Sequence, residues 1–241
     1  MTTINFLIFP CPVCKTMIYS LKVSSCNTID AKFFTDGYIE GPMYSENGKI
    51  KECSVCKKLS WLNDILNPIK LSHIEFKNYR KDHELIGFAW SPHCWEDECW
   101  SYIPFLEKAP WRNEAEEKYI RIRALWSWNA CRRKNCQLND GLLQAAATNC
   151  ERLLDLFDVA DDSEFIMRCE ALRELGRFKE CLTQLDRHLD NRYTETVRTI
   201  RALAEEGNPC VKRIKSDLDW ISKLRLNRLK PRKNERTTRE E

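Results

Sequence analysis

The sequence predicts an α+β protein, in which a small antiparallel β domain is followed by an array of α-helical hairpins. Two Cys-x-x-Cys pairs lie among short apolar runs and turn signals in the first 60 residues. After Pro110 the apolar residues instead recur at the spacing of amphipathic helices. We therefore expect a β domain at residues 1–60, an aromatic-rich connecting segment at 61–110, a helical domain at 111–230 and a disordered basic tail at 231–241.

The composition is ordinary for a globular protein, with 43% hydrophobic and 31% charged residues among 241. No stretch approaches the roughly 20 apolar residues that cross a bilayer, and Met1–Asn5 lacks the basic start of a secretory signal. The thirteen cysteines are an odd number, and most of those outside the two pairs occupy apolar helical positions, which favours reduced thiols. We therefore expect a cytoplasmic protein without a membrane span. The net charge of +3 does not imply a polyanionic partner for the whole chain.

The two cysteine pairs are typical of metal-binding turns. A short apolar run leads into Cys11-Pro12-Val13-Cys14-Lys15, and the same pattern returns as Cys53-Ser54-Val55-Cys56-Lys57. Two residues between thiols let one tight turn point both sulfurs at one ion, and two such turns complete a tetrahedron. The spacing therefore predicts a β zinc ribbon that holds one structural Zn²⁺ through Cys11, Cys14, Cys53 and Cys56.

The interval between the pairs is about 40 residues long. Closing it costs about 3 kcal/mol, whereas structural zinc supplies roughly 10–16 kcal/mol, so the metal term dominates. Asp36-Gly37 lies between the extended stretches Ala31–Thr35 and Tyr38–Glu40 and predicts a type I′ hairpin, while Asn47-Gly48 marks a second reversal. We expect an antiparallel sheet of three to five strands with the metal at one end.

Other assignments of the thiols remain open at this stage. Cys26 lies inside the interval and is either a packing residue or a fifth thiol near the ion. Either pair could serve redox chemistry, as in thioredoxin-like enzymes, although no βαβ pattern surrounds them. Four thiolates accept iron as well as zinc, and the lack of a redox context favours zinc.

Several motifs together resemble a group of uncharacterised bacterial proteins with an N-terminal zinc ribbon and a C-terminal tetratricopeptide-like helical region. The resemblance covers most of the chain and implies this architecture, without an assigned activity. Lys15 and Lys57 stand where glycine is usual, which changes the surface charge of the metal turns. The motifs are Cys11-Pro12-x-Cys14, Asn27-Thr28-x-x-Ala31-x-Phe33-x-Thr35-Asp36-Gly37, Gly41-Pro42-Met43, Cys53-x-x-Cys56, Glu117 with Tyr119, Arg121, Arg123 and Trp126, and Leu172–Phe178.

The connecting segment has little periodicity and many aromatic residues. Such residues usually pack two domains together, and an exposed platform for bases or peptides is the alternative. His93, Cys94 and Cys99 could bind a second metal, but no fourth ligand has a recognisable spacing. A cysteine nucleophile with His83 or His93 as base lacks an orienting carboxylate. The aromatic residues are Trp61, Phe76, Tyr79, Phe88, Trp90, Trp95, Trp100, Tyr102 and Phe105.

The helical half begins at Asn113–Glu116, a pattern typical of a capping box. The third and fourth helices resemble one tetratricopeptide repeat, with Cys169 and Cys181 at the usual small positions and Gly176 at the turn. Six helices pair into three hairpins, about the minimum for a short solenoid. Their apolar faces are Ala115, Tyr119, Ile122 and Trp126; Leu143, Ala147, Cys150, Leu154 and Phe157; Phe165, Cys169 and Leu172; Phe178, Cys181, Leu182, Leu185 and Leu189; Tyr193, Val197, Ile200 and Leu203; Val211, Ile214, Leu218, Ile221 and Leu224.

The last predicted helix carries basic residues around an apolar stripe. It is either a capping helix with a solvated outer face or a basic amphipathic helix that meets nucleic acid or an anionic membrane. Asp217 and Asp219 dilute its charge. The candidate binding residues are Lys212, Arg213, Lys223, Arg225 and Arg228.

The sequence shows no constellation of acids, bases or phosphate-binding glycines of the kind an enzyme requires. We therefore expect a non-catalytic, zinc-binding adaptor or scaffold that binds another protein through its helical half. Nucleic-acid binding is the alternative, because zinc ribbons and basic tails both occur in such proteins. Acidic residues nearly balance the lysines of the ribbon, which makes this alternative the weaker of the two.

Overall fold

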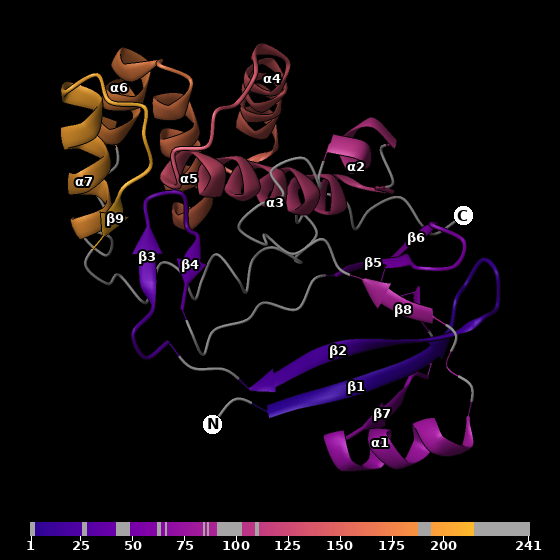
Figure 1. Cartoon of the computed structure of the whole chain (residues 1–241). Helices are drawn as coiled ribbons and strands as arrows, with labels where there is room; N and C mark the ends of the chain where they lie inside the picture. Colours follow the sequence, from indigo (N-terminus) through magenta and orange to yellow (C-terminus); the bar gives the residue numbers. More distant parts are fainter. Residues whose placement is uncertain are drawn as a thin grey trace, which may run out of the picture. The chain divides into compact units, whose positions relative to one another are not determined.

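The computed structural model describes residues 3–25, 28–41, 49–61, 64–65, 67–83, 85, 87–90, 103–108, 111–187 and 194–214. It confirms the predicted α+β class. The chain divides into two compact units, which are described separately (Figure 1). The first unit comprises Met1–Ala31 and Glu40–Trp95, and the second comprises Lys32–Ile39 and Glu96–Glu241. This division differs from the predicted boundaries, because part of the interval between the cysteine pairs belongs with the helices.

The first unit contains a six-stranded sheet in the order β6-β5-β8-β2-β1-β7 (Figure 1). Most pairings are antiparallel, but β2 and β8 run parallel with Ile18 opposite Gly87. The sheet is therefore larger than the three to five strands predicted, and it is mixed. Its strands are β1 (Thr3–Pro10), β2 (Met17–Ser25), β5 (Ile50–Cys53), β6 (Leu59–Trp61), β7 (Ile69–Leu71) and β8 (Gly87–Trp90).

The middle of strand β1, Phe6–Phe9, is buried on both faces, which explains its uninterrupted apolar run. Phe6 and Ile8 pack on one side against Phe76, and the rings of Phe6 and Phe76 stack with centroids 3.9 Å apart. Leu7 and Phe9 face the other side, toward the cysteines. Phe76 comes from helix α1 (His73–Asp82), so this aromatic residue fills the core of its own unit.

The second unit combines helices with a three-stranded sheet in the order β4-β3-β9. Consecutive helices from α3 to α7 pack against one another, and α7 also contacts α5 (Figure 1). None of the helices in the described parts of the chain is long and apolar enough to cross a membrane. The elements are β3 (Lys32–Phe34), β4 (Ile39–Glu40), α2 (Ile103–Lys108), α3 (Glu114–Arg133), α4 (Asp140–Leu156), α5 (Asp162–Glu174), α6 (Phe178–Arg187), α7 (Thr194–Glu205) and β9 (Arg213–Ile214).

The turn between α5 and α6 lies where the sequence predicts it. Gly176 has a φ of +75°, a conformation that favours glycine. Its N–H donates to the Arg173 carbonyl at 2.9 Å, and the N–H of Arg177 donates to the Leu172 carbonyl at 2.9 Å. These two bonds form the glycine-based helix end that satisfies the last carbonyls of α5. The chain therefore reverses within three residues and packs α6 against α5.

Three local predictions are wrong. In α4, Leu142 is buried in place of the predicted Leu143, which is 42% exposed. Asn139 caps this helix and so fixes where its first turn begins. Asp36 lacks the positive φ of a type I′ turn, since only Gly37 has it. The Glu116 carboxylate accepts the N–H of Arg112 instead of completing a capping box with Asn113.

The sixth predicted helix also begins differently from the prediction. Val211 precedes an extended segment, in which Ile214 pairs with Phe33 and Arg213 with Phe34. Ile214 is buried, so its apolar side chain contributes to the core from a strand. The rest of this predicted helix lies outside the described residues.

An ion pair at the buried carboxylate of Glu117 joins α3 to α4 and gives a pH-dependent prediction. Arg152 contacts both oxygens of Glu117 at 2.9 Å, and Arg121 contacts the same carboxylate at 2.8 Å. The hydrogen bond from Arg152 is the main cause that lowers the pKa of Glu117, against the opposing effect of burial. Because the folded-state pKa lies below the unfolded-state value, this stabilisation is present above the unfolded pKa and is lost as the pH falls through the folded pKa.

We expect Glu117→Gln to lower the free energy of unfolding by about 1–2 kcal/mol at pH 7 and by much less near pH 3. Urea denaturation at both pH values measures this difference. Glu180→Gln is the matched control, because the Glu180 side chain is 41% exposed, against 8% for Glu117, so its pair with Arg177 contributes little. An equal loss at both pH values would contradict the assignment.

Candidate metal centre

The two cysteine pairs form two hairpin turns with the same backbone geometry. The turn between β1 and β2 spans Cys11–Thr16, and the turn between β5 and β6 spans Cys53–Lys58. The N–H of the first cysteine donates to a carbonyl five residues ahead, at 2.8 Å in one turn and 3.0 Å in the other. The N–H four residues ahead donates back to the cysteine carbonyl, at 2.9 and 2.8 Å. The repeated sequence pattern therefore gives a repeated structure.

The four sulfurs of the turns lie close together, with all ligand atoms within 4.8 Å of one another. Across the turns, the Sγ atoms of Cys11 and Cys56 are 3.7 Å apart, and those of Cys14 and Cys53 are 3.8 Å apart. A tetrahedral ion with metal–sulfur bonds of about 2.3 Å holds its sulfurs about 3.8 Å apart. The geometry thus fits one metal ion, and this donor set suits zinc and iron alike.

The surroundings of Cys11 and Cys14 shift the pKa values of their thiols in opposite directions. Burial raises the pKa of Cys11 to about 11, whereas the hydroxyl and amide of Thr16 lower the pKa of Cys14 to about 6. Cys14 therefore ionises readily, and Cys11 requires a strong positive charge to do so. Apolar side chains surround the centre and limit the access of water to it. They include Leu7, Phe9, Ile18 and Ile65.

Lys15 and Lys57, which follow the two pairs, both adopt a backbone conformation that favours glycine. Their φ angles are +62° and +57°, in the left-handed region that disfavours side chains with a Cβ. The Lys15 Nζ donates to the Pro12 carbonyl at 2.8 Å, which offsets part of the strain at that turn. Lys57 is therefore the clearer position for a test.

We expect Lys57→Gly to raise the free energy of unfolding by about 0.5–1 kcal/mol, because relief of backbone strain exceeds the added flexibility of glycine. Thermal denaturation of the metal-loaded protein measures the effect. The neighbouring change Lys58→Gly is the control, because Lys58 does not have a positive φ. The same sign for both variants would show that strain is not the cause.

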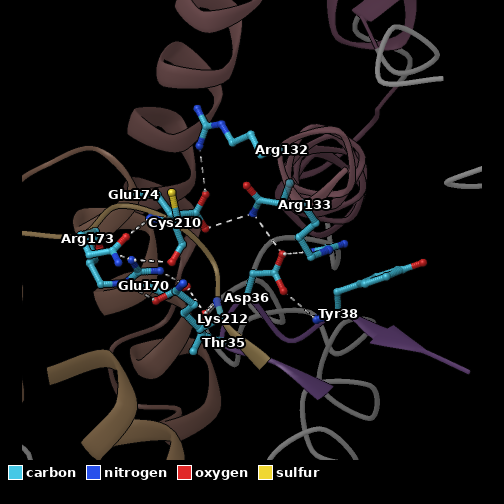
Figure 2. A network of polar contacts seen from close by, with 12 residues as sticks. Thr35, Asp36, Tyr38, Arg132, Arg133, Glu170, Arg173, Glu174, Cys210 and Lys212 are labelled. Carbon is cyan, nitrogen blue, oxygen red and sulfur yellow. Dashed lines mark hydrogen bonds and ion pairs between the residues drawn. The ribbon is translucent and has the colours of Figure 1, made fainter. Parts of the chain in front are cut away.

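A second cluster, which the sequence analysis missed, binds the 32–39 hairpin (Lys32–Ile39) to the helices of the second unit (Figure 2). Asp36 at its tip is fully buried. Its Oδ2 accepts from Asn129 at 3.0 Å and from Arg133 at 3.4 Å, while its backbone carbonyl accepts from Trp126 Nε1 at 2.8 Å. Three side chains of α3 therefore recognise one residue of the hairpin.

The same hairpin is bound to α5 and to the segment after α7. Thr35 donates to Glu170 at 2.5 Å, and Glu170 is paired with Arg173 at 2.5 Å (Figure 2). Arg173 also donates to the carbonyls of Asn208 and Cys210. The N–H of Thr35 donates to the Lys212 carbonyl at 3.0 Å, and the N–H of Lys212 donates to the Thr35 hydroxyl at 3.2 Å. A hairpin from between the two cysteine pairs is thus an integral part of the helical unit.

Arg133 adds a further contact to the hairpin. Its guanidinium lies 4.3 Å from the ring centroid of Phe34 and 4.8 Å from that of Tyr38. Stacking of this kind contributes more where water is excluded. The aromatic residues on both sides of Thr35–Gly37 therefore place the acidic tip against α3.

Most of the remaining candidate residues lie outside the part of the chain that the structure describes. Lys212 and Arg213 are exposed, and their backbones are used in pairing with the hairpin. Lys223, Arg225 and Arg228 lie outside the described residues. The same is true of Cys26 and of the proposed second ligand group His93, Cys94 and Cys99.

No known protein family, curated protein or solved structure matches this sequence. The resemblance based on the motifs therefore stays a prediction. What the chain does has to be argued from the metal centre and the helical unit.

Proposed function

We propose that this chain is a non-catalytic zinc-binding adaptor, with one structural Zn²⁺ in a β zinc ribbon and a tetratricopeptide-like helical domain that binds another protein. The observation that carries the proposal is the geometry of the four sulfurs, with separations of 3.7 and 3.8 Å across the turns. Four protein ligands fill a tetrahedron and leave no position for water or substrate, which is typical of structural sites.

The buried charges of the helical unit also favour a structural role. Asp36, Glu170 and Arg173 are fully buried. Asp36 accepts a hydrogen bond from Asn129 of α3, and Glu170 accepts two from Arg173 on the same helix. A general acid or base has to reach its substrate, directly or through one water. The side chains of Asp36, Glu170 and Arg173 are instead fully buried, and their hydrogen bonds bind the hairpin to α3 and α5.

The helical arrangement supports the second half of the proposal. Helices α3 to α7 pack in sequence, and Gly176 gives α5 and α6 the tight turn of a helical repeat. The 32–39 hairpin covers the faces of α3 and α5 around Asp36. A protein partner is therefore expected on a different surface of this unit.

Substitution of the metal by Co²⁺ tests the structural site. We expect one ion per chain by native mass spectrometry and the visible absorption of a tetrahedral tetrathiolate, unchanged by added imidazole because no coordination position is open. A spectral change with imidazole would indicate an open site and reopen catalysis. Iron in the purified protein, with its thiolate charge-transfer band, would contradict the zinc assignment.

Retention on immobilised heparin or DNA separates the adaptor from the nucleic-acid alternative. Phosphate contacts weaken steeply with salt, so an adaptor should elute at low ionic strength. Strong retention that falls with salt and requires Lys212 and Arg213, which are both exposed, would favour nucleic-acid binding.

A further inference from the structure

The helical unit contains a cavity of about 150 Å³ between α3, α4 and the end of α5. Leu125, Ala146 and Cys150 form part of its apolar wall, while Trp128, Asn129 and Glu174 contribute polar groups. All of these residues belong to the second unit. The cavity lies next to the cluster that holds the hairpin, because Asn129 contacts both Asp36 and Glu174.

Buried polar atoms without a hydrogen-bond partner concentrate at this cavity. Among the described residues there are five such side-chain atoms, and three of them are Trp128 Nε1, Asn129 Oδ1 and Glu174 Oε2. Native proteins rarely leave such atoms unpaired, and each one indicates a missing partner such as water, an ion or a ligand. Three on the walls of one cavity indicate that the partner occupies that cavity.

The hydrogen bonds of Asn129 fix which of its atoms is free. Its Nδ2 donates to Asp36 Oδ2 at 3.0 Å and to Glu174 Oε1 at 3.2 Å. A flipped amide would place its oxygen against two carboxylates, so Oδ1 is the unpaired atom. Glu174 Oε2 is also an acceptor, and the nearest cation, Arg132 Nη1, is 3.8 Å away, beyond hydrogen-bond distance (Figure 2).

The charge around Glu174 favours a cation. Burial, followed by the carboxylates of Glu170 and Asp36, raises the pKa of Glu174 well above its usual value. Arg173 is committed to Glu170 and to backbone carbonyls. Asp36 and Glu170 each have a close arginine partner, whereas Arg132, which also lines the cavity, stays 3.8 Å from Glu174. A closer positive group in the cavity would therefore stabilise the charged form of this carboxylate.

We propose that this cavity binds a small organic cation, a primary ammonium with a compact apolar body. The ammonium donates to Glu174 Oε2 and Asn129 Oδ1, and the hydrocarbon part packs on Leu125, Ala146 and Cys150. The cavity is partly open to solvent, and its volume of about 150 Å³ is close to that of a cavity that holds benzene, which sets the size of the body. This site goes beyond the adaptor proposal and does not depend on it.

Titration of the full metal-loaded chain with benzylammonium at neutral pH tests the site, with benzyl alcohol as the uncharged probe of the same shape. We expect saturable binding with a dissociation constant of about 1 mM or tighter, and at least about tenfold weaker binding of the alcohol. The indole N–H resonance of Trp128, assigned from Trp128→Phe, should shift with benzylammonium.

Two variants and one control locate the binding. Glu174→Gln should weaken benzylammonium at least about tenfold, and Ala146→Leu, which fills the cavity, should abolish binding. Glu205→Gln on α7 is exposed and should change nothing. Equal affinity for both probes, retained affinity in both cavity variants, or no saturation by about 10 mM would each overturn the proposal and assign the cavity to water alone.

Discussion

Replacing Cys53 and Cys56 with serine is expected to remove the metal and unfold the first unit. Binding of structural zinc supplies roughly 10–16 kcal/mol of apparent free energy at neutral pH. The free energy of unfolding of a whole domain is typically about 5–15 kcal/mol, so loss of the metal can remove all of the stability of the unit. The apolar shell of Leu7, Phe9 and Ile18 is built around the turns, so it loses its arrangement with them. Native mass spectrometry should show one ion in the parent chain and none in the variant.

The helical unit should survive this change, since its core is made of its own residues. Far-ultraviolet circular dichroism should keep most of its helical signal, while the backbone NMR resonances of β1 and β5 collapse into the unfolded range. Cys136→Ser is the matched control, because Cys136 is exposed and free. A variant that retained the metal, or kept the sheet folded without it, would contradict a structural role for the ion.

The metal turns were predictable because their information is local. The same five-residue sequence pattern begins at Cys11 and at Cys53. Each copy makes the same two backbone hydrogen bonds, one of which reaches the residue that follows the pattern. The end of α5 was predictable for the same reason, since Gly176 adopts a positive φ. Local chemistry of this kind does not depend on what packs from elsewhere.

The sheet exceeded the prediction because several of its strand pairings are non-local. β8 joins β2 and β5 across many residues, and nothing in its short sequence encodes a parallel pairing with Ile18. β7 likewise pairs with β1 through only three residues, Ile69–Leu71. Short strands carry too little pattern for their partners to be identified from the sequence.

The position of the 32–39 hairpin also could not be predicted from local signals. Asp36-Gly37 marks a turn, but the carboxylate finds its partners more than 90 positions away, at Asn129 and Arg133. A second long-range contact binds the segment after α7 to α5, because Arg173 donates to the carbonyls of Asn208 and Cys210. The apolar spacing of Val211 and Ile214 suits a helix, and tertiary hydrogen bonds override it.

Asp36→Ala is expected to have the second-largest effect, a loss of about 3–5 kcal/mol in the free energy of unfolding of the helical unit. The change leaves Arg133 and the Asn129 amide without their shared acceptor in a water-excluded site, and removing one partner of a buried pair costs that much. Arg133 stays close to Phe34 and Tyr38, so the loss arises from the charge and hydrogen bonds at Asp36.

Urea denaturation followed by helical circular dichroism measures this loss, with Asp36→Asn expected to fall between the parent chain and Asp36→Ala. Asp155→Ala is the control, because the Asp155 side chain is 72% exposed and its ion pair with Arg152, at 3.7 Å, lies in contact with water. This variant should change the free energy of unfolding by less than about 0.5 kcal/mol. If Asp36→Ala cost no more than this control, the hairpin would not be a stabilising part of the helical unit. A double-mutant cycle with Arg133→Met then separates the pair energy from the packing energy, because residues in contact show non-additive losses.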